Sequence, residues 1–166
     1  MKTNNNKNIS GVQVVDIQPK DWRKFHRLFK KIINEDFGAY PEKMRLDSCK
    51  ARNIKKGLGV KKVILVAKNG AKILGFLIGI SQPSGLGFIN WLAVKKESRG
   101  LGIGNSLIQT WQKKTQAMGC HKLCAETSNL KNKTFYEKMG FCLEGEKKQD
   151  KYGMDYLIFG KIIGIY

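Results

Sequence analysis

Residues 92–106, with the sequence LAVKKESRGLGIGNS, join the end of an apolar stretch to three alternating glycines and the start of an amphipathic segment. The apolar pattern favours a strand up to Val94, and the pattern that follows favours a helix over 102–118. The glycines between 100 and 104 let backbone N–H groups approach a ligand closely, and a helix N-terminus carries about half a positive charge. The segment therefore predicts a cradle for a phosphate group.

Two common phosphate-binding motifs do not fit this segment. A P-loop ends in Gly-Lys-Ser/Thr, whereas the chain has Gly104, Asn105 and Ser106 at these positions. A dinucleotide-binding loop requires a third glycine three residues after the second, and the candidate positions hold Asn105 and Leu107. Glu126 lies near the place of a ribose-binding acid, but without the glycine we treat this match as coincidental.

Outward from this segment, the chain predicts alternating strands and helices. The expected strands are 12–17, 62–67, 73–80, 88–94, 122–127, 141–147 and 152–162, and the expected helices are 19–33, 42–56, 102–118 and 132–139. Asn69 and Gly70 predict a hairpin turn, and the β-α-β crossover in the middle implies a parallel pair. We therefore expect an α/β fold with a mixed, mostly antiparallel sheet, helices on both faces and an exposed last strand.

Length and composition indicate one globular domain. The 166 residues fit a single domain at 11–166, preceded by an Asn- and Lys-rich segment, 1–10, that we expect to be frayed. Hydrophobic residues make up 42% of the chain, which argues against a disordered protein. No apolar run is long enough to span a membrane, and the N-terminus lacks the apolar core of a secretory signal. We expect a cytoplasmic protein.

The cysteines predict neither a disulfide framework nor a metal site. Four cysteines are too few to staple a chain of this length, so reduced thiols are expected. Cys120, His121 and Cys124 have the spacing of a partial zinc site, but His26 is the other histidine and no second pair completes four ligands. We expect no metal.

Two motifs carry a resemblance to a known family. The pattern R-x-x-G-x-G from Arg99 to Gly104 resembles the acyl-CoA pyrophosphate loop of the GNAT superfamily of acetyl-CoA-dependent N-acetyltransferases. The segment from Asn129 to Phe141 resembles the later motif of that superfamily, in which an asparagine precedes a short helix ending in Phe/Leu-Tyr-Glu-x-x-Gly-Phe. The order and spacing of the motifs, and the order of predicted elements, are also those of the family.

The resemblance implies that the central parallel strands splay apart and that the thioester of acetyl-CoA lies in the gap. It gives Tyr136 the role of general acid that protonates the departing CoA thiolate, and a phenol with a pKa near ~10 stays protonated for that purpose. The strand before the glycine loop would pair with the pantetheine arm. The residues expected to bind acetyl-CoA are Leu92, Ala93, Val94, Arg99, Gly100, Leu101, Gly102, Ile103, Gly104, Asn105, Asn129 and Tyr136.

The base that deprotonates the amine is less clearly marked. Many relatives use a glutamate on one of the splayed strands, but 88–94 has no carboxylate and one common position on the next strand holds Cys124. Glu126 shares the face of Cys124 because side chains alternate along a strand, and it is the candidate base, acting directly or through a water. A surface carboxylate paired with a lysine is the alternative interpretation. Glu35 and Asp36 are further candidates, and Cys124 is a weak candidate nucleophile.

The sequence therefore predicts an acyltransferase that moves acetyl from acetyl-CoA to a primary amine in a ternary complex. The net charge is +18, and no acidic residue lies between Asp47 and Glu97. Because such a protein repels polycations, a peptide or protein amine is weakly favoured over a small-molecule amine. The same charge supports an alternative, a non-catalytic basic module that binds nucleic acid or the ribosome, although a lysine-rich composition would produce it too. The sequence leaves open a monomer or a homodimer.

Overall fold

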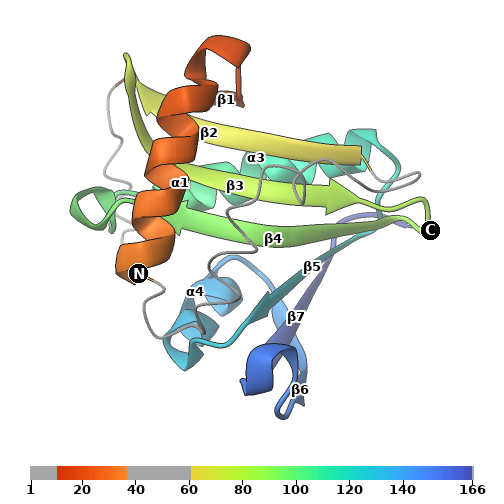
Figure 1. The fold of residues 1–166 in the computed structure, drawn as a ribbon. Helices are drawn as coiled ribbons and strands as arrows, with labels where there is room; N and C mark the ends of the chain where they lie inside the picture. Colours follow the sequence, from red (N-terminus) through yellow and green to blue (C-terminus); the bar gives the residue numbers. More distant parts are fainter. Residues whose placement is uncertain (1–10, 37–60, 166) are drawn as a thin grey trace, which may run out of the picture.

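The computed structural model describes residues 11–36 and 61–165, so the predicted helix at 42–56 and the segment 1–10 lie outside the described residues. The strands of the described part form one sheet with the spatial order β1-β2-β3-β4-β5-β7-β6 (Figure 1). The strands are β1 Val12–Asp16, β2 Lys61–Asn69, β3 Lys72–Ser81, β4 Leu86–Val94, β5 Lys122–Thr127, β6 Cys142–Lys147 and β7 Tyr156–Ile162. The helices are α1 Trp22–Asp36, α3 Ile103–Ala117 and α4 Lys133–Lys138, with 3-10 turns η1 Pro19–Asp21, η3 Lys96–Ser98, η4 Leu130–Asn132 and η5 Lys151–Gly153.

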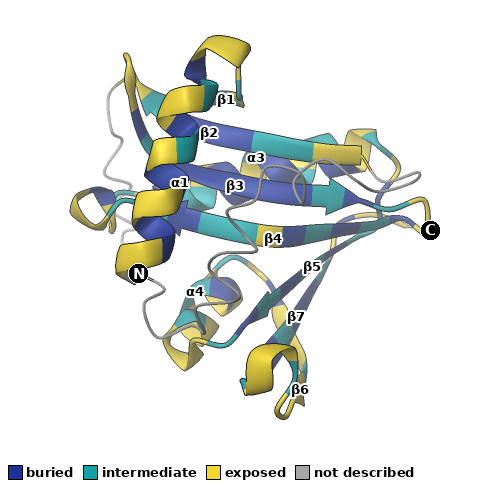
Figure 2. Cartoon of the chain, viewed as in Figure 1, coloured by how far each residue is buried: buried dark blue, intermediate teal, exposed yellow. Residues whose placement is uncertain are grey.

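Helix α1 covers one face of the sheet. Its apolar residues recur at helical spacing and are buried, whereas its outer side is exposed (Figure 2). The rings of Phe25 and Phe29 both lie 5.4 Å from the ring of Phe76 in β3. The buried carboxylate of Asp21, just before α1, accepts a hydrogen bond of 2.7 Å from Lys68 in β2. This bond and the charge of Lys68 outweigh burial and lower the pKa of Asp21.

Helix α3 covers the other face, so the prediction of helices on both faces is confirmed. Its buried side chains, among them Leu107 and Trp111, belong to one core cluster with Leu77 and Leu123 of the sheet. Trp111 packs directly on the backbone of Gly79 in β3, where a Cβ atom would lie 2.5 Å from Cζ2 of the indole. Glycine at this position therefore allows the helix to approach the sheet closely.

Strands β4 and β5 form the predicted parallel pair, and they separate after four residue pairs. Their pairing runs from Leu86 opposite Lys122 to Ile89 opposite Ala125. At Asn90 the register between β3 and β4 shifts, because Ile89 and Trp91 both pair with consecutive residues of β3 and leave Asn90 as an extra residue. A bulge of this kind bends a strand and increases its twist. Beyond it β4 stays paired with β3 and β5 stays paired with β7, so the strands diverge (Figure 1).

The structure corrects three details of the sequence prediction. The last strand, β7, is not exposed at an edge: it lies between β5 and β6, and Gly160 pairs with Cys124 on one side and Cys142 on the other. This strand begins at Tyr156 rather than at 152, because a 3-10 turn occupies the preceding residues. The first hairpin turns at residues 70–71 rather than 69–70, since the residue at 69 still pairs as part of β2.

Candidate active site

Two adjoining cavities lie where β4 and β5 diverge. A cavity of about 550 Å³ extends from the end of β4 to the glycine loop and α4. A second cavity of about 420 Å³ lies between the separated strands and the connection from β6 to β7. Leu92, Asn132 and Tyr136 line both cavities, so the two spaces meet at these residues. A molecule could therefore extend from the glycine loop into the gap in the sheet.

The glycine loop lines the larger cavity at Gly100 and at residues 102–105. Gly100 and Gly102 have φ angles of 75° and 79°, which lie in the left-handed region that favours glycine. Within the described part of the chain, no backbone carbonyl accepts a hydrogen bond from the amides of residues 100–105, and the first helical bond runs from Ser106 N to Gly102 O at 3.0 Å. These amides stand at the positive end of the 15-residue helix α3. This geometry is that of an anion site.

All residues that the resemblance assigned to acetyl-CoA, except Leu101, line this larger cavity. Arg99 lies at the loop entrance, where its Nε donates to the carbonyl of Val94 at 3.0 Å, so its side chain folds back onto the end of β4. Asn129, just before η4, also lines this cavity, and its Oδ1 accepts a hydrogen bond from Lys131 N at 3.0 Å, which caps the turn η4. Residues from three elements thus surround one space.

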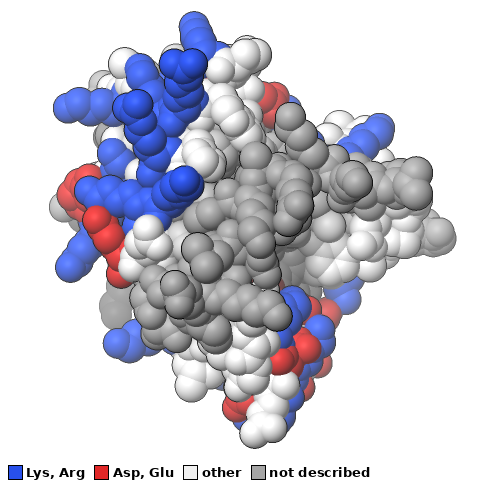
Figure 3. Space-filling view, in the orientation of Figure 1, with Lys and Arg blue, Asp and Glu red and all other residues white. Residues whose placement is uncertain are grey.

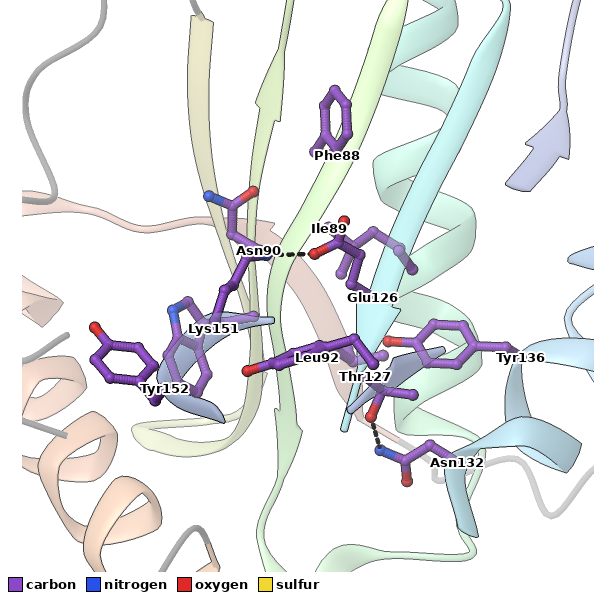
Figure 4. A pocket seen from close by; sticks show the side chains of 13 residues that line it. Phe88, Ile89, Asn90, Leu92, Glu126, Thr127, Asn132, Tyr136, Lys151 and Tyr152 are labelled. Carbon is purple, nitrogen blue, oxygen red and sulfur yellow. Dashed lines mark hydrogen bonds and ion pairs between the residues drawn. The ribbon is translucent and has the colours of Figure 1, made fainter. Parts of the chain in front are cut away.

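Tyr136 lies in α4 at the junction of the two cavities. Its ring stacks on Phe159 at 5.1 Å and meets Phe135 and Phe141 edge to face at 5.3 and 5.5 Å. These contacts leave the side chain only 6% exposed and hold the ring in one orientation. The hydroxyl points from α4 toward the end of β5 (Figure 4), and Tyr136 lines both cavities. The phenol is therefore positioned where a bound molecule would pass.

Glu126 lies on β5 in the smaller cavity, and it is paired with two lysines. Its Oε1 accepts from Lys147 Nζ at 2.8 Å and its Oε2 accepts from Lys151 Nζ. Partial burial acts to raise the pKa of Glu126, but the hydrogen bonds and charges of both lysines outweigh it, so the pKa is lowered. The carboxylate is ionised at neutral pH and is a weaker base than an unpaired glutamate.

The other candidate bases and nucleophiles lie elsewhere. Glu35 lines a separate cavity beside α1 and pairs with Lys31 at 3.8 Å, and of Asp36 only the place at the end of α1 is described. Cys124 lies on the face of Glu126, as predicted, but it lines neither cavity of the gap. Burial, together with nearby carboxylates, raises the pKa of this thiol, which disfavours the reactive thiolate.

The sequence analysis missed a polar cluster at the end of β5. The buried hydroxyl of Thr127 accepts hydrogen bonds from Asn129 N at 3.2 Å and from Asn132 Nδ2 at 3.0 Å. These bonds tie the end of the strand to η4 and place Asn132 at the junction of both cavities (Figure 4). Asn132 lies inside the second motif, the segment 129–141, so the sequence could have identified it as a site residue. Lys147 and Lys151 lie outside both motifs, so no sequence pattern identified them as site residues.

Neither a membrane span nor a metal cluster occurs in the ranges that the structure describes. Every helix there is too short or too polar to cross a membrane. In the same ranges, no three His, Cys, Asp or Glu side chains are arranged to hold a metal ion.

Comparisons with known proteins agree with this fold. A family model described as the acetyltransferase (GNAT) domain matches residues 61–142. An uncharacterized N-acetyltransferase of Methanocaldococcus jannaschii is 38% identical over 79 residues, which are 46% of this chain and 50% of that protein. The chain thus spans about half the length of the curated relative it matches.

Solved structures with the same fold cover nearly the whole chain. The ribosomal-protein-S18-alanine N-acetyltransferase from Escherichia coli has a TM-score of 0.71 and 16% identity, over 93% of this chain and 96% of that chain. An aminoglycoside 6′-N-acetyltransferase complexed with coenzyme A has a TM-score of 0.73 and 14% identity, over 93% of this chain and 98% of that chain. Residues 61–142 thus match the GNAT acetyltransferase domain, and the chain shares the fold of these acetyltransferases.

Proposed function

We propose that the protein transfers an acetyl group from acetyl-CoA to a primary amine, by direct attack of the amine on the thioester in a ternary complex. The observation that carries this proposal is the run of amides at residues 100–105 without backbone acceptors in the described part of the chain, in a loop that lines a cavity also lined by Tyr136. The diphosphate of CoA matches this site in charge, because both the N–H groups and the end of α3 are positive. The neighbour that was solved with coenzyme A has the same fold.

The separated part of β4 suits the pantetheine arm. Beyond Ile89, no strand of the described part pairs with the edge of β4 that faces β5. Leu92, Ala93 and Val94 lie in this stretch and line the larger cavity. Backbone groups on a strand edge can pair with the amides of an extended ligand, as they do with another strand. Such pairing would align the thioester with the gap, where an oriented attack gains most of its advantage.

In the proposed reaction, the amine nitrogen forms a bond to the thioester carbonyl carbon and the carbon–sulfur bond breaks. The sulfur leaves as a thiolate and takes the proton of the Tyr136 hydroxyl, which solvent then restores. Glu126 accepts the amine proton through a water. Because its two lysine partners lower its pKa, Glu126 is a weak base and gains little free energy from accepting this proton. The rate of transfer should therefore depend on the pKa of the acceptor amine.

Acetyl transfer is tested by calorimetric titration with acetyl-CoA and by thiol release in the presence of a panel of amines. The panel contains N-terminal peptide amines, lysine side chains and small amines, since a peptide or protein amine is the weakly favoured acceptor. We expect binding at sub-millimolar concentration and amine-dependent release of CoA. A protein that binds no acetyl-CoA at that concentration would contradict the proposal.

The basic surface supports a second candidate function, the binding of a polyanion such as nucleic acid. Blue side chains gather over α1 in Figure 3, and the exposed cations of this helix are Arg23, Lys24, Arg27, Lys30 and Lys31. Binding through such a surface weakens steeply as the salt concentration rises. Each Lys or Arg that is replaced by a neutral residue should reduce the slope of log K against log salt concentration by about one. Titration of labelled single-stranded RNA at several salt concentrations tests this candidate. An affinity that does not respond to salt would contradict it.

A further inference from the structure

We propose that the amine acceptor carries a carboxylate close to its amine, and that Lys151 binds this carboxylate while Glu126 faces the amine. The inference rests on the proposed acetyl transfer and specifies its acceptor. The shared chemistry, an amine beside a carboxylate, has two sources: a free α-amino acid, or a peptide whose second residue is acidic.

The smaller cavity contains one group of each charge. Among the described residues that line it, Glu126 and Lys151 are charged, whereas the others are apolar, aromatic or uncharged polar. Lys147 also binds Glu126, but it does not line the cavity, and the carboxylate of Asp150 lies 3.8 Å from its Nζ. The charges of the two carboxylates, Glu126 and Asp150, balance those of the two ammonium groups, Lys147 and Lys151. The pair that lines the cavity is the carboxylate of Glu126 beside the ammonium of Lys151 (Figure 4).

Lys151 keeps the capacity to bind a further anion. Its side chain is 51% exposed, and its ammonium lies 5.2 Å from the centre of the Tyr156 ring. An ammonium has three N–H donors, so the bond to Glu126 leaves donors for a second carboxylate. A carboxylate bound there would stand next to the oxygens of Glu126, which attract the amine of the same molecule. The arrangement is complementary to a molecule that can place an amine and a carboxylate side by side.

The backbone fixes Lys151 and its neighbour Tyr152 beside the cavity. Asp150 N donates to Met154 O at 2.9 Å, and Gly153 N donates to Asp150 O at 3.0 Å, which closes the turn. Within it, Tyr152 has a φ of 59°, in the left-handed region that a tyrosine seldom adopts. The strain of such a residue is tolerated where the surroundings determine it, and such residues cluster at binding sites.

The aromatic lining indicates the rest of the acceptor. Tyr152 and Tyr136 lie on opposite sides of the cavity, and Phe88, Trp91 and Tyr156 also line it (Figure 4). These rings favour an apolar or aromatic group next to the amine. A polyamine would instead place further positive charges near the two lysines, where the lining offers no additional carboxylate. We therefore expect an acceptor such as phenylalanine, or a peptide that begins with an apolar residue followed by an acidic one.

The experiment compares matched acceptors on three forms of the protein. The acceptor pairs are phenylalanine with phenylalaninamide, and the dipeptide amide Phe-Asp with Phe-Asn. The proteins are the wild type, Lys151→Gln, and the control Lys148→Gln, whose lysine pairs with Glu146 and Asp155 outside the cavity. The readout is the ratio of kcat/KM within each pair. Because the amine pKa values of the acceptors are the same for every protein, the change in this ratio isolates the carboxylate contact.

We expect Lys151→Gln to lower the preference for the carboxylate-bearing member of one pair by about tenfold or more, the usual effect of losing a charged hydrogen bond. The pair that responds identifies the source, and Lys148→Gln leaves the ratio unchanged. A ratio that Lys151→Gln does not alter, or that Lys148→Gln alters equally, would overturn the inference while acetyl transfer stands. If the wild type binds no acetyl-CoA and acetylates none of the four acceptors, the proposed function fails and the inference fails with it.

Discussion

Replacement of Gly102 by alanine tests whether the conformation of the glycine loop matters for CoA. Gly102 has φ 79° and ψ 0°, and no heavy atom lies within 4 Å of the position that a Cβ atom would occupy. Alanine therefore meets no neighbour, and its whole cost is the left-handed backbone, about 1–2 kcal/mol. Because the loop is exposed at this residue, the free protein can relax to negative φ and turn the N–H groups away from the cavity.

The cost should then appear in binding rather than in folding. To bind CoA, the variant must return to the left-handed conformation, so its Kd rises by a factor of roughly 5–30, the equivalent of that free energy. Calorimetric titration with CoA measures the Kd, and urea denaturation measures the free energy of unfolding, which should change little. The control Gly145→Ala also meets no neighbour but lies in β6, at an ordinary φ, and should leave the Kd unchanged. An unchanged Kd for Gly102→Ala would refute this account of the loop.

Three further predictions concern the phenol, the core and the pH dependence. Tyr136→Phe keeps the stacked ring but removes the proton donor, so kcat should fall about 10²-fold. The Kd for acetyl-CoA, measured by calorimetry, should not change. A loss of binding would instead assign Tyr136 to ligand positioning. Gly79→Ala places a Cβ 2.5 Å from the buried ring of Trp111, so the free energy of unfolding in urea should fall by about 1–3 kcal/mol, whereas Gly145→Ala should not change it. Because the pKa of Glu126 is lowered in the folded protein, its carboxylate stabilises the fold at pH values above the pKa of an unfolded glutamate. This contribution disappears as pH falls through the lowered pKa. Glu126→Gln should therefore reduce the loss of folding free energy on acidification. If wild type and Glu126→Gln lose stability equally in acid, the ion pairs of Glu126 do not contribute to stability.

The sequence was sufficient to predict most strands, both long helices of the described part and the glycine loop. These features depend on local signals: apolar periodicity for α1 and α3, and glycine where the backbone has positive φ at 100 and 102. The diverging strands were implied by the family resemblance, and the structure adds their cause at Asn90, an extra residue in β4 that no local pattern marks.

The rest of the site depends on contacts between distant residues. Lys147 and Lys151 follow Glu126 by 21 and 25 residues, and the antiparallel pairing of β6 with β7 brings them to it. That pairing also puts β7 inside the sheet, which chain order alone does not reveal. The left-handed Tyr152 runs against the preference of its residue type, so a strand was predicted there and a turn is found.

The most direct test of the central claim is an NMR comparison of backbone amide shifts on addition of CoA and of pantetheine, which lacks the diphosphate. If the amides at 100–105 bind the diphosphate, CoA will shift their signals strongly and pantetheine will not, although both will shift signals along 92–94. Signals at 100–105 that stay unchanged with saturating CoA, or that respond equally to pantetheine, would contradict the account.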